Sequence, residues 1–207
     1  ASNQNITFLV GAGVSAESGI PTFRGKEGYW KIGSTNYQPQ EIGTYEMFLK
    51  QPLEVWKWFL FRNTVCRAAE PNLGHYALVE IEKMLGDKFA LITQNVDDLH
   101  ERAGSTNVIH LHGELLKARS SYDEKDIQKW KTDLVLGDLC QKGHQLRPHI
   151  VWFGEGVPMI ESAVEICKTA NVLMIIGTSM QVYPAASLMH YAPEKTPTYF
   201  IDPKPSM

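Results

Sequence analysis

The sequence is poor in cysteine. Its 207 residues contain only three, Cys66, Cys140 and Cys167, and no two of them form a C-x-x-C pair. A sparse, odd number of cysteines is typical of a reducing, intracellular compartment, and three thiolates cannot complete a four-cysteine zinc site. We therefore expect a cytoplasmic protein that folds without disulfides, with a core large enough for its length.

Long apolar runs and a dominant charge are also missing. No stretch reaches the roughly 18 apolar residues of a membrane span, and the first residues carry no signal-peptide pattern. Lys and Arg number 20 against 23 Asp and Glu, a formal charge of −3 without a block of one sign. This balance argues against the basic patch of a nucleic-acid-binding protein. We expect a globular chain that binds neither nucleic acid nor membrane.

Short apolar runs alternate with helical stretches. Predicted strands occupy residues 6–10, 89–92, 108–111, 172–176 and 198–201, and their near-continuous apolar character suits a parallel sheet covered on both faces. Predicted helices occupy residues 53–69, 73–85, 157–169 and 184–191, the first opened by Pro52 and the second capped by Asn72 and ended by Gly86. The alternation predicts a doubly wound α/β fold.

Two stretches interrupt this alternation. Residues 25–70 hold loops and an aromatic-rich helix, and residues 117–147 are polar and weakly periodic. We expect them to form a smaller module inserted beside the sheet. The sheet domain would then comprise residues 1–24, 71–116 and 148–207, within a single catalytic unit of 207 residues.

A glycine-rich turn follows the first predicted strand, at the edge where open α/β sheets bind ligands. Gly11-Ala12-Gly13-Val14-Ser15-Ala16 fits G-x-G-x-x-G/A. Its glycines permit close approach of a phosphate, although an ordinary glycine turn has the same sequence, and the position after a strand favours the phosphate. A dehydrogenase would carry an acidic residue about 20 positions later. Residues 30–36 hold none, which counts against hydride transfer.

The other strands also end in polar residues. The clusters are Thr93-Gln94-Asn95-Val96-Asp97, His112-Gly113-Glu114, Gly177-Thr178-Ser179 and Asp202-Pro203. Each alone is ordinary turn chemistry, but their convergence on one sheet edge favours a shared site. His110 and His112 are two apart on a strand and share a face. We favour a packed core histidine for His110, whereas His112 fits a general base and a satisfied histidine equally well.

In their order along the chain, these motifs resemble the sirtuin family. Residues 11–25 (GAGVSAESGIPTFRG) resemble its first signature, residues 93–100 (TQNVDDLH) its second, His112-Gly113 its third and residues 151–155 (VWFGE) its fourth, with Gly177-Thr178-Ser179 completing the order. The resemblance spans residues 6–202. It implies a Rossmann-type parallel sheet with helices on both faces and a small module. It also implies an NAD-dependent protein-lysine deacylase that yields nicotinamide, free lysine and O-acyl-ADP-ribose.

By position, the resemblance implies a set of contacts with NAD. The set is Gly11, Ala12, Gly13, Ser15, Ile20, Phe23, Arg24, Tyr29, Gln94, Asn95, Asp97, Gly177, Thr178, Ser179 and Asp202. Gln94 and Asn95 would hold the nicotinamide ribose, Asp97 the carboxamide, and Tyr29 would lie in a loop closing over the cofactor. His112, as the base, and Asn95 would be catalytic. Family members usually continue beyond the position of Met207, so we expect the adenine contacts to be the least complete.

The resemblance also implies a substrate site. Val151, Trp152, Phe153, Gly154 and Glu155 would pair with an acyl-lysine peptide as an added strand, with Val151 and Phe153 beside the acyl-lysine channel. Sirtuins that favour succinyl or malonyl lysine carry Tyr-x-x-Arg, and this chain has Phe59-Leu60-Phe61-Arg62. Phe59 and Arg62 share a helix face. Arg62 either pairs with an acyl carboxylate, which we favour slightly, or snorkels from an aromatic face that includes Trp56.

The zinc pattern of the family is missing. Many sirtuins carry two C-x-x-C pairs, which should fall near Ser120 and Asp123 and near Leu139 and Lys142, none of them cysteine. Cys140 with His144 and the nearby His149 form a poor ligand set, so an ordinary cysteine and surface histidines are favoured. We expect no bound metal and a small module braced by a helix over residues 123–130.

Two other functions use the same residues. One is transfer of ADP-ribose to protein or hydrolysis of NAD, and the other is a sensor that binds NAD or ADP-ribose without turnover. Residues 151–155 favour deacylation, because the first alternative has less need of a peptide strand. His112 argues against a sensor, because binding alone requires no base. The oligomeric state stays open, and a monomer is compatible with the sequence.

Overall fold

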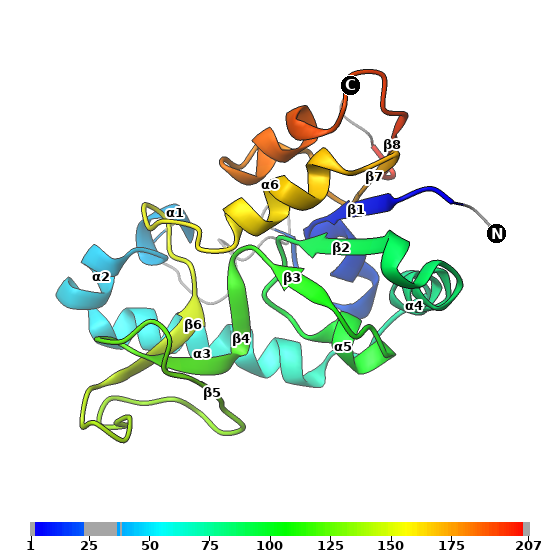
Figure 1. Ribbon diagram of the computed structural model, residues 1–207. Helices are drawn as coiled ribbons and strands as arrows, with labels where there is room; N and C mark the ends of the chain where they lie inside the picture. Colours follow the sequence, from blue (N-terminus) through cyan, green and yellow to red (C-terminus); the bar gives the residue numbers. More distant parts are fainter. Residues whose placement is uncertain (1–2, 23–36, 38, 205–207) are drawn as a thin grey trace.

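A parallel five-stranded sheet forms the centre of the computed structural model, which describes residues 3–22, 37 and 39–204 (Figure 1). Its order is β3-β2-β1-β7-β8. The strands are β1 (Ile6–Val10), β2 (Phe89–Thr93), β3 (Val108–His110), β7 (Val172–Ile176) and β8 (Thr198–Ile201). All neighbouring strands pair in parallel. The predicted doubly wound α/β fold is confirmed, and every predicted strand is found within one residue of its expected ends.

Helices cover both faces of this sheet because alternate side chains of its strands point in opposite directions. Phe8 and Val10 pack with Leu78 of α4 (Leu73–Leu85), whereas Leu9 packs with Ala163 of α6 (Ile160–Lys168). The second face is also covered by η3 (Ala185–Tyr191), a 3-10 helix where we expected an α-helix. Figure 1 shows α6 and α4 on opposite sides of the sheet. The near-continuous apolar strand β1 is thus buried on both faces, as the sequence predicted. The same prediction is wrong for the edge strand β8, whose four residues are all exposed.

Helix α4 begins after Asn72 and ends before Gly86, as its predicted caps indicated. The Asn72 Oδ1 accepts a hydrogen bond from the Gly74 amide, and the chain leaves the helix at Gly86. The long helix α3 (Pro52–Ala68) begins at Pro52, and α6 begins three residues later than predicted. The remaining helices are η1 (Ala12–Ser18), α1 (Pro39–Ile42), α2 (Tyr45–Lys50), η2 (Gly86–Lys88) and α5 (Leu99–Ala103). None of the helices in the described ranges is long and apolar enough to cross a membrane.

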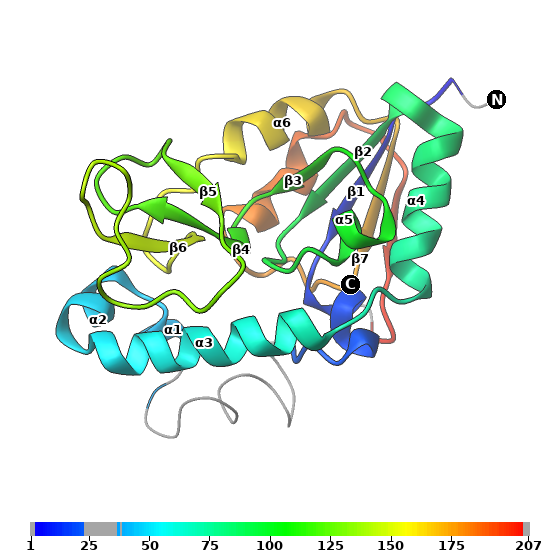
Figure 2. The ribbon, with the colours of Figure 1, turned by 90° about the horizontal axis from the view of Figure 1, so that it is seen from below.

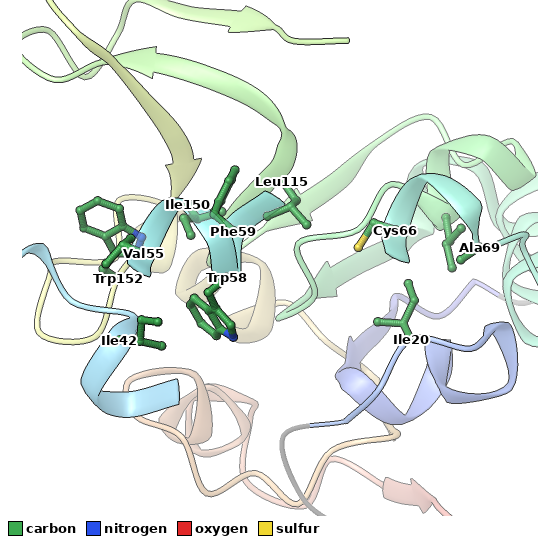
Figure 3. Packing of buried hydrophobic residues seen from close by; sticks show 11 residues of the cluster. Ile20, Ile42, Val55, Trp58, Phe59, Cys66, Ala69, Leu115, Ile150 and Trp152 are labelled. Carbon is green, nitrogen blue, oxygen red and sulfur yellow. The ribbon is translucent and has the colours of Figure 1, made fainter. Parts of the chain in front are cut away.

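A second, antiparallel sheet lies beside the first. Its order is β5-β4-β6, with β4 (Gly113–Ser120), β5 (Ile127–Lys129) and β6 (Leu146–Ile150). The domain boundaries predicted at 116 and 148 therefore fall inside β4 and β6. Helix α3 runs along this sheet toward η1 (Figure 2). Its residues Val55 and Phe59 pack against Ile150 and Trp152 in one buried cluster, seen in Figure 3.

The helix predicted over residues 123–130 is wrong. The segment turns and then forms β5, which pairs with β4 through Ala118 and Gln128. The Ser120 Oγ accepts hydrogen bonds from the amides of Tyr122 and Asp123, and Asp123 Oδ1 accepts one from Lys125. Short polar side chains that satisfy nearby amides in this way compete with a helix and favour a turn.

Candidate active site

The glycine-rich turn after β1 packs directly against the turn after β7. The Gly11 amide donates to the Ile176 carbonyl at 3.0 Å, and the Gly13 amide donates to the Gly177 carbonyl at 2.8 Å. A Cβ at Gly13 would lie 2.7 Å from the Gly177 Cα, and Gly177 itself has φ +66°. These glycines are therefore required by contact between two turns of the protein. Their presence alone does not indicate a phosphate, so the case for a ligand rests on the polar side chains around them.

A buried chain of hydrogen bonds converges on Ser15. The backbone N–H of Asn72 donates to His75 Nδ1 at 3.0 Å, so the proton of this ring lies on Nε2. His75 Nε2 in turn donates to Ser15 Oγ at 3.2 Å. The Ser15 hydroxyl then donates to Asp97 Oδ2 at 3.0 Å. Burial lowers the pKa of His75 to about 4, which keeps its ring neutral. Ser15 is thus held in a fixed orientation toward Asp97.

The predicted cofactor residues of the second motif gather around the same turns. Asn95 Nδ2 donates to the Gly11 carbonyl at 2.9 Å, and Gln94 Nε2 donates to Thr178 Oγ1 at 3.1 Å. Asp97 is 3% exposed, and Oδ1 accepts from the Leu99 amide. Burial raises the pKa of Asp97, against the lowering effect of the hydrogen bonds from Leu99 and Ser15. The ends of β1, β2 and β7 therefore bring together one connected polar set.

Two histidines donate hydrogen bonds to consecutive carbonyl groups of this loop. His112 Nδ1 donates to the Gln94 carbonyl at 3.1 Å, and His110 Nδ1 donates to the Asn95 carbonyl at 3.0 Å. Burial lowers the pKa of His112, so its ring is neutral with an unprotonated Nε2. Burial also acts to lower the pKa of His110, but its contact with Glu101 outweighs this and raises it. His110 is the buried, hydrogen-bonded histidine that we expected, and His112 has the protonation state of a base.

The segment 151–155 forms a turn, not an extended strand. Four of its five amides donate within the chain: Val151 to the His112 carbonyl, Phe153 to the Gly43 carbonyl, Glu155 to the Trp152 carbonyl and Trp152 to Glu155 Oε1. Gly154 has φ +88°, which suits glycine. Trp152 is buried, whereas the Phe153 side chain is 42% exposed. A strand paired here would have to use carbonyl groups and the Gly154 amide.

The predicted acyl-specificity pair is buried on α3. Phe59 is 2% exposed and packs in the cluster of Figure 3, and Arg62 is 6% exposed. The Arg62 guanidinium carbon lies 4.7 Å from the centre of the Trp58 ring. Snorkelling requires the charged group to reach water, so this burial does not fit that alternative. Recognition of an acyl carboxylate by Arg62 stays a prediction.

The loops of the small module do not offer a zinc site at the expected positions. Cys140 Sγ donates to Ser120 Oγ at 3.8 Å, and the Lys142 ammonium lies 3.7 Å from an Asp123 oxygen. The His144 ring stacks on Tyr122 with 4.5 Å between centroids. A lysine paired with the carboxylate is a poor neighbour for a divalent cation, so the donor set does not fit zinc.

Another group of donor atoms among the described residues comprises Glu101, His110 and Glu114, which lie within 4.8 Å of one another. Glu101 is already paired with His110, and Glu114 is paired with Lys117 at 2.7 Å. Both carboxylates are thus matched by cationic groups of the protein, and we assign no metal to them.

Other predicted residues are placed at the edge of the site or lie outside the described ranges. Ile20 is buried after η1, Ser179 follows β7, and Asp202 follows β8 with Oδ1 accepting from the Lys204 amide. Phe23, Arg24 and Tyr29 lie outside the described residues.

Sequence reasoning missed His75 and His100, whose rings meet edge to face at 5.0 Å. The only signal for His75 was its position three residues after the cap Asn72, which indicates a helix start and not a site.

Comparison with known proteins identifies extensive similarity. The Sir2 family model matches residues 11–184. An NAD-dependent protein deacylase of Helicobacter pylori is 47% identical over 201 residues, covering 97% of this chain and 85% of that protein. One from Aggregatibacter actinomycetemcomitans is 46% identical over 198 residues, covering 96% and 92%. A Sir2 homologue solved with NAD has a TM-score of 0.84 at 43% identity, covering 96% of this chain and 78% of that one. A Sir2 complex with deacetylated p53 peptide and 3'-O-acetyl ADP-ribose has a TM-score of 0.77 at 30% identity, covering 95% and 81%.

Proposed function

The chain belongs to the Sir2 family, and on that basis we propose that it is an NAD-dependent protein-lysine deacylase. The observation that carries the proposal is the state of His112. Its Nδ1 is anchored on the Gln94 carbonyl and burial lowers its pKa, so a neutral ring presents an unprotonated Nε2 at the edge that holds Asn95 and Asp97. The products would be nicotinamide, free lysine and O-acyl-ADP-ribose.

The buried polar set fits the nicotinamide half of NAD. Gln94 and Asn95 would orient the ribose hydroxyls, and Asp97, held by Ser15, would accept from the carboxamide. When bound, NAD supplies an electron-poor ribose carbon, as nicotinamide leaves, for the acyl oxygen to attack. His112 would then take a proton from a ribose hydroxyl, which can attack the acyl-derived carbon. Residues Gly177, Thr178, Ser179 and Asp202 would face the adenosine half, and Phe23, Arg24 and Tyr29 would complete the cofactor contacts.

The acylated peptide would bind at residues 151–155 as an added strand. Because four amides of this segment are engaged, the pairing would use the carbonyl groups of Val151 and Phe153 and the Gly154 amide. The exposed Phe153 ring would cover the lysine chain and limit access of water. Arg62 would admit acyl groups that carry a carboxylate.

The sheet domain and the small module would act as one catalytic unit. The three cysteines are buried free thiols, which suits the cytoplasmic location that we propose.

Product analysis tests the function. The protein is incubated with NAD and an acetyl-lysine or succinyl-lysine peptide, and the products are identified by mass spectrometry. O-acyl-ADP-ribose is expected. ADP-ribosylated protein, or free ADP-ribose without deacylation, would instead identify a transferase or hydrolase, and intact NAD would identify a sensor.

Two histidine variants sharpen the test. His112→Ala should lower deacylation by at least about 100-fold because the base is removed, while NAD binding persists because the Ser15, Asn95 and Asp97 contacts remain. His144→Ala is the matched control, because its ring stacks on Tyr122 in the small module. Full activity of His112→Ala would refute the mechanism.

A further inference from the structure

A buried arginine lies beneath the proposed peptide segment. The Arg147 side chain on β6 is 7% exposed and donates two parallel hydrogen bonds to Glu155, at 2.9 Å to Oε2 and 2.7 Å to Oε1. A third bond reaches the Ile150 carbonyl at 3.1 Å. The guanidinium carbon also lies 4.1 Å from the centre of the Trp152 ring. Within the described part of the chain, the hydrogen bonds, the ion pair and the ring contact of the Arg147 side chain thus go to residues 150–155.

Glu155 links Arg147 to the backbone of the 151–155 turn. The oxygen that accepts from Arg147 at 2.7 Å also accepts from the Trp152 amide at 2.9 Å, and the Glu155 amide closes the turn on the Trp152 carbonyl. Burial acts to raise the pKa of Glu155, but its hydrogen bonds with Arg147 and Trp152 lower it, so the carboxylate is charged. A bidentate, charge-assisted pair fixes direction as well as distance.

A second arginine supports the same turn more weakly. Arg119 on β4 lies 4.0 Å from Glu155 and donates to the Ile150 carbonyl at a long 3.5 Å. The centroid of the Trp152 ring also lies 5.1 Å from that of Phe48 on α2. Trp152 therefore contacts both a guanidinium and an aromatic ring. Phe153, the next residue, is left exposed with its amide bonded to the Gly43 carbonyl.

We propose that Arg147 is a positioning residue for the acylated peptide, acting through Glu155 and Trp152 to present the carbonyl groups of the 151–155 turn. The inference rests on the deacylase function proposed above. Arg147 would act without contacting either substrate itself. Its hydrogen bonds do not extend to the Ser15, Asn95 and Asp97 set, so its loss should weaken use of the peptide and spare use of NAD.

The test separates the two Michaelis constants. Arg147→Lys keeps the charge but cannot form the bidentate pair. We expect its KM for an acetyl-lysine peptide at saturating NAD to rise about tenfold, with KM for NAD at saturating peptide within about twofold of wild type. Arg67→Lys is the matched control, because Arg67 on α3 pairs with Asp133 at 3.2 Å and donates to the Thr132 carbonyl. Both its constants should stay at wild-type values.

A double variant separates positioning from simple stabilisation. Arg147→Met with Glu155→Met replaces a buried ion pair by apolar side chains, which often preserves the folding free energy. Here we expect a lowered melting temperature, because Arg119 and the Trp152 amide also lose Glu155, but a KM for NAD near wild type and a peptide KM that stays raised. A wild-type peptide KM in the double variant, or equal rises of both constants in Arg147→Lys, would overturn the inference.

Failure of the proposed function is distinguishable from failure of this inference. Wild-type protein that makes no O-acyl-ADP-ribose refutes the function. An active wild type whose peptide KM is unchanged by Arg147→Lys refutes only the role of Arg147.

Discussion

The polar groups beside the two sheets are held by different interactions, hydrogen bonds at one and ion pairs at the other. At the edge of the parallel sheet, a neutral His75, a serine and an asparagine surround Asp97, and the connections are hydrogen bonds between buried groups. In the antiparallel sheet, Arg147 and Arg119 converge on the Glu155 carboxylate. The first arrangement suits a ligand recognised through hydrogen bonds, because Ser15, Asn95 and Asp97 are linked by hydrogen bonds between buried groups. The second suits a backbone segment that must keep its shape without a ligand.

The largest expected loss of stability comes from disrupting the contact between the turns that follow β1 and β7. A Cβ at Gly177 would lie 2.5 Å from the Val14 amide nitrogen, and φ is +66°. Gly177→Ala should lower the free energy of unfolding by more than about 3 kcal/mol. Gly143→Ala is the control in the small module: φ is +81°, but no described atom lies within 4 Å of the added Cβ. It should lose only about 1 kcal/mol. Equal losses by urea denaturation would contradict the contact argument.

Acid should weaken the two sheets in different pH ranges. Burial lowers the pKa of His75 to about 4 and of His100 to about 3, so these rings stay neutral in the folded state while the unfolded chain takes up protons below about 6.5. Their contribution is complete above that value and is lost as the pH falls, at about 1.4 kcal/mol per pH unit for each ring. The lowered pKa of Glu155 makes its contribution disappear only below about 4.5.

His100→Leu tests this order. Neither ring nitrogen of His100 has a hydrogen-bond partner among the described residues, so leucine leaves no new unsatisfied group. Denaturation between pH 7 and pH 5 should show a slope reduced by about one proton. The same slope as in wild type would mean that His100 is charged in the folded protein.

Arg62 should set the balance between acyl groups. Loss of a charge-assisted hydrogen bond to an acyl carboxylate is expected to lower kcat/KM for a succinyl peptide about tenfold more than for an acetyl peptide in Arg62→Ala. Both substrates are measured on the same variant, so a general loss of folded protein cancels. An unchanged ratio would exclude the arginine clamp.

Chelators should not change the stability of the small module, whereas removal of the Ser120 hydroxyl should lower it. Incubation with EDTA should leave the melting temperature unchanged. Ser120→Ala removes the acceptor of the Tyr122 and Asp123 amides and should destabilise the protein by about 1 kcal/mol. Thr64→Ala, which removes an exposed hydroxyl on α3, is the control. Stoichiometric zinc in purified protein by elemental analysis would contradict the metal-free module.

The features that sequence predicted best are those with a local cause. The near-continuous apolar run of β1 and the Asn72 cap produced correct elements because neighbouring residues decide them. The helix expected over residues 123–130 failed for an equally local reason, the turn around Ser120. His75 could not be connected to Asp97 beforehand, because their link requires α4 to be docked on the sheet. The ionic pairing of Arg147 with Glu155 was likewise invisible, since it depends on how the chain returns after β6.

His112 belongs to both halves of the site through different parts of one residue. Its ring donates to the Gln94 carbonyl, and its own carbonyl accepts from the Val151 amide. His112 therefore connects the loop of Gln94 and Asn95 directly with the turn of residues 151–155. If His112 is the base proposed above, a peptide that shifted Val151 on docking would displace His112 through this hydrogen bond. The timing of proton removal would then depend on the arrival of the second substrate, without a separate moving element.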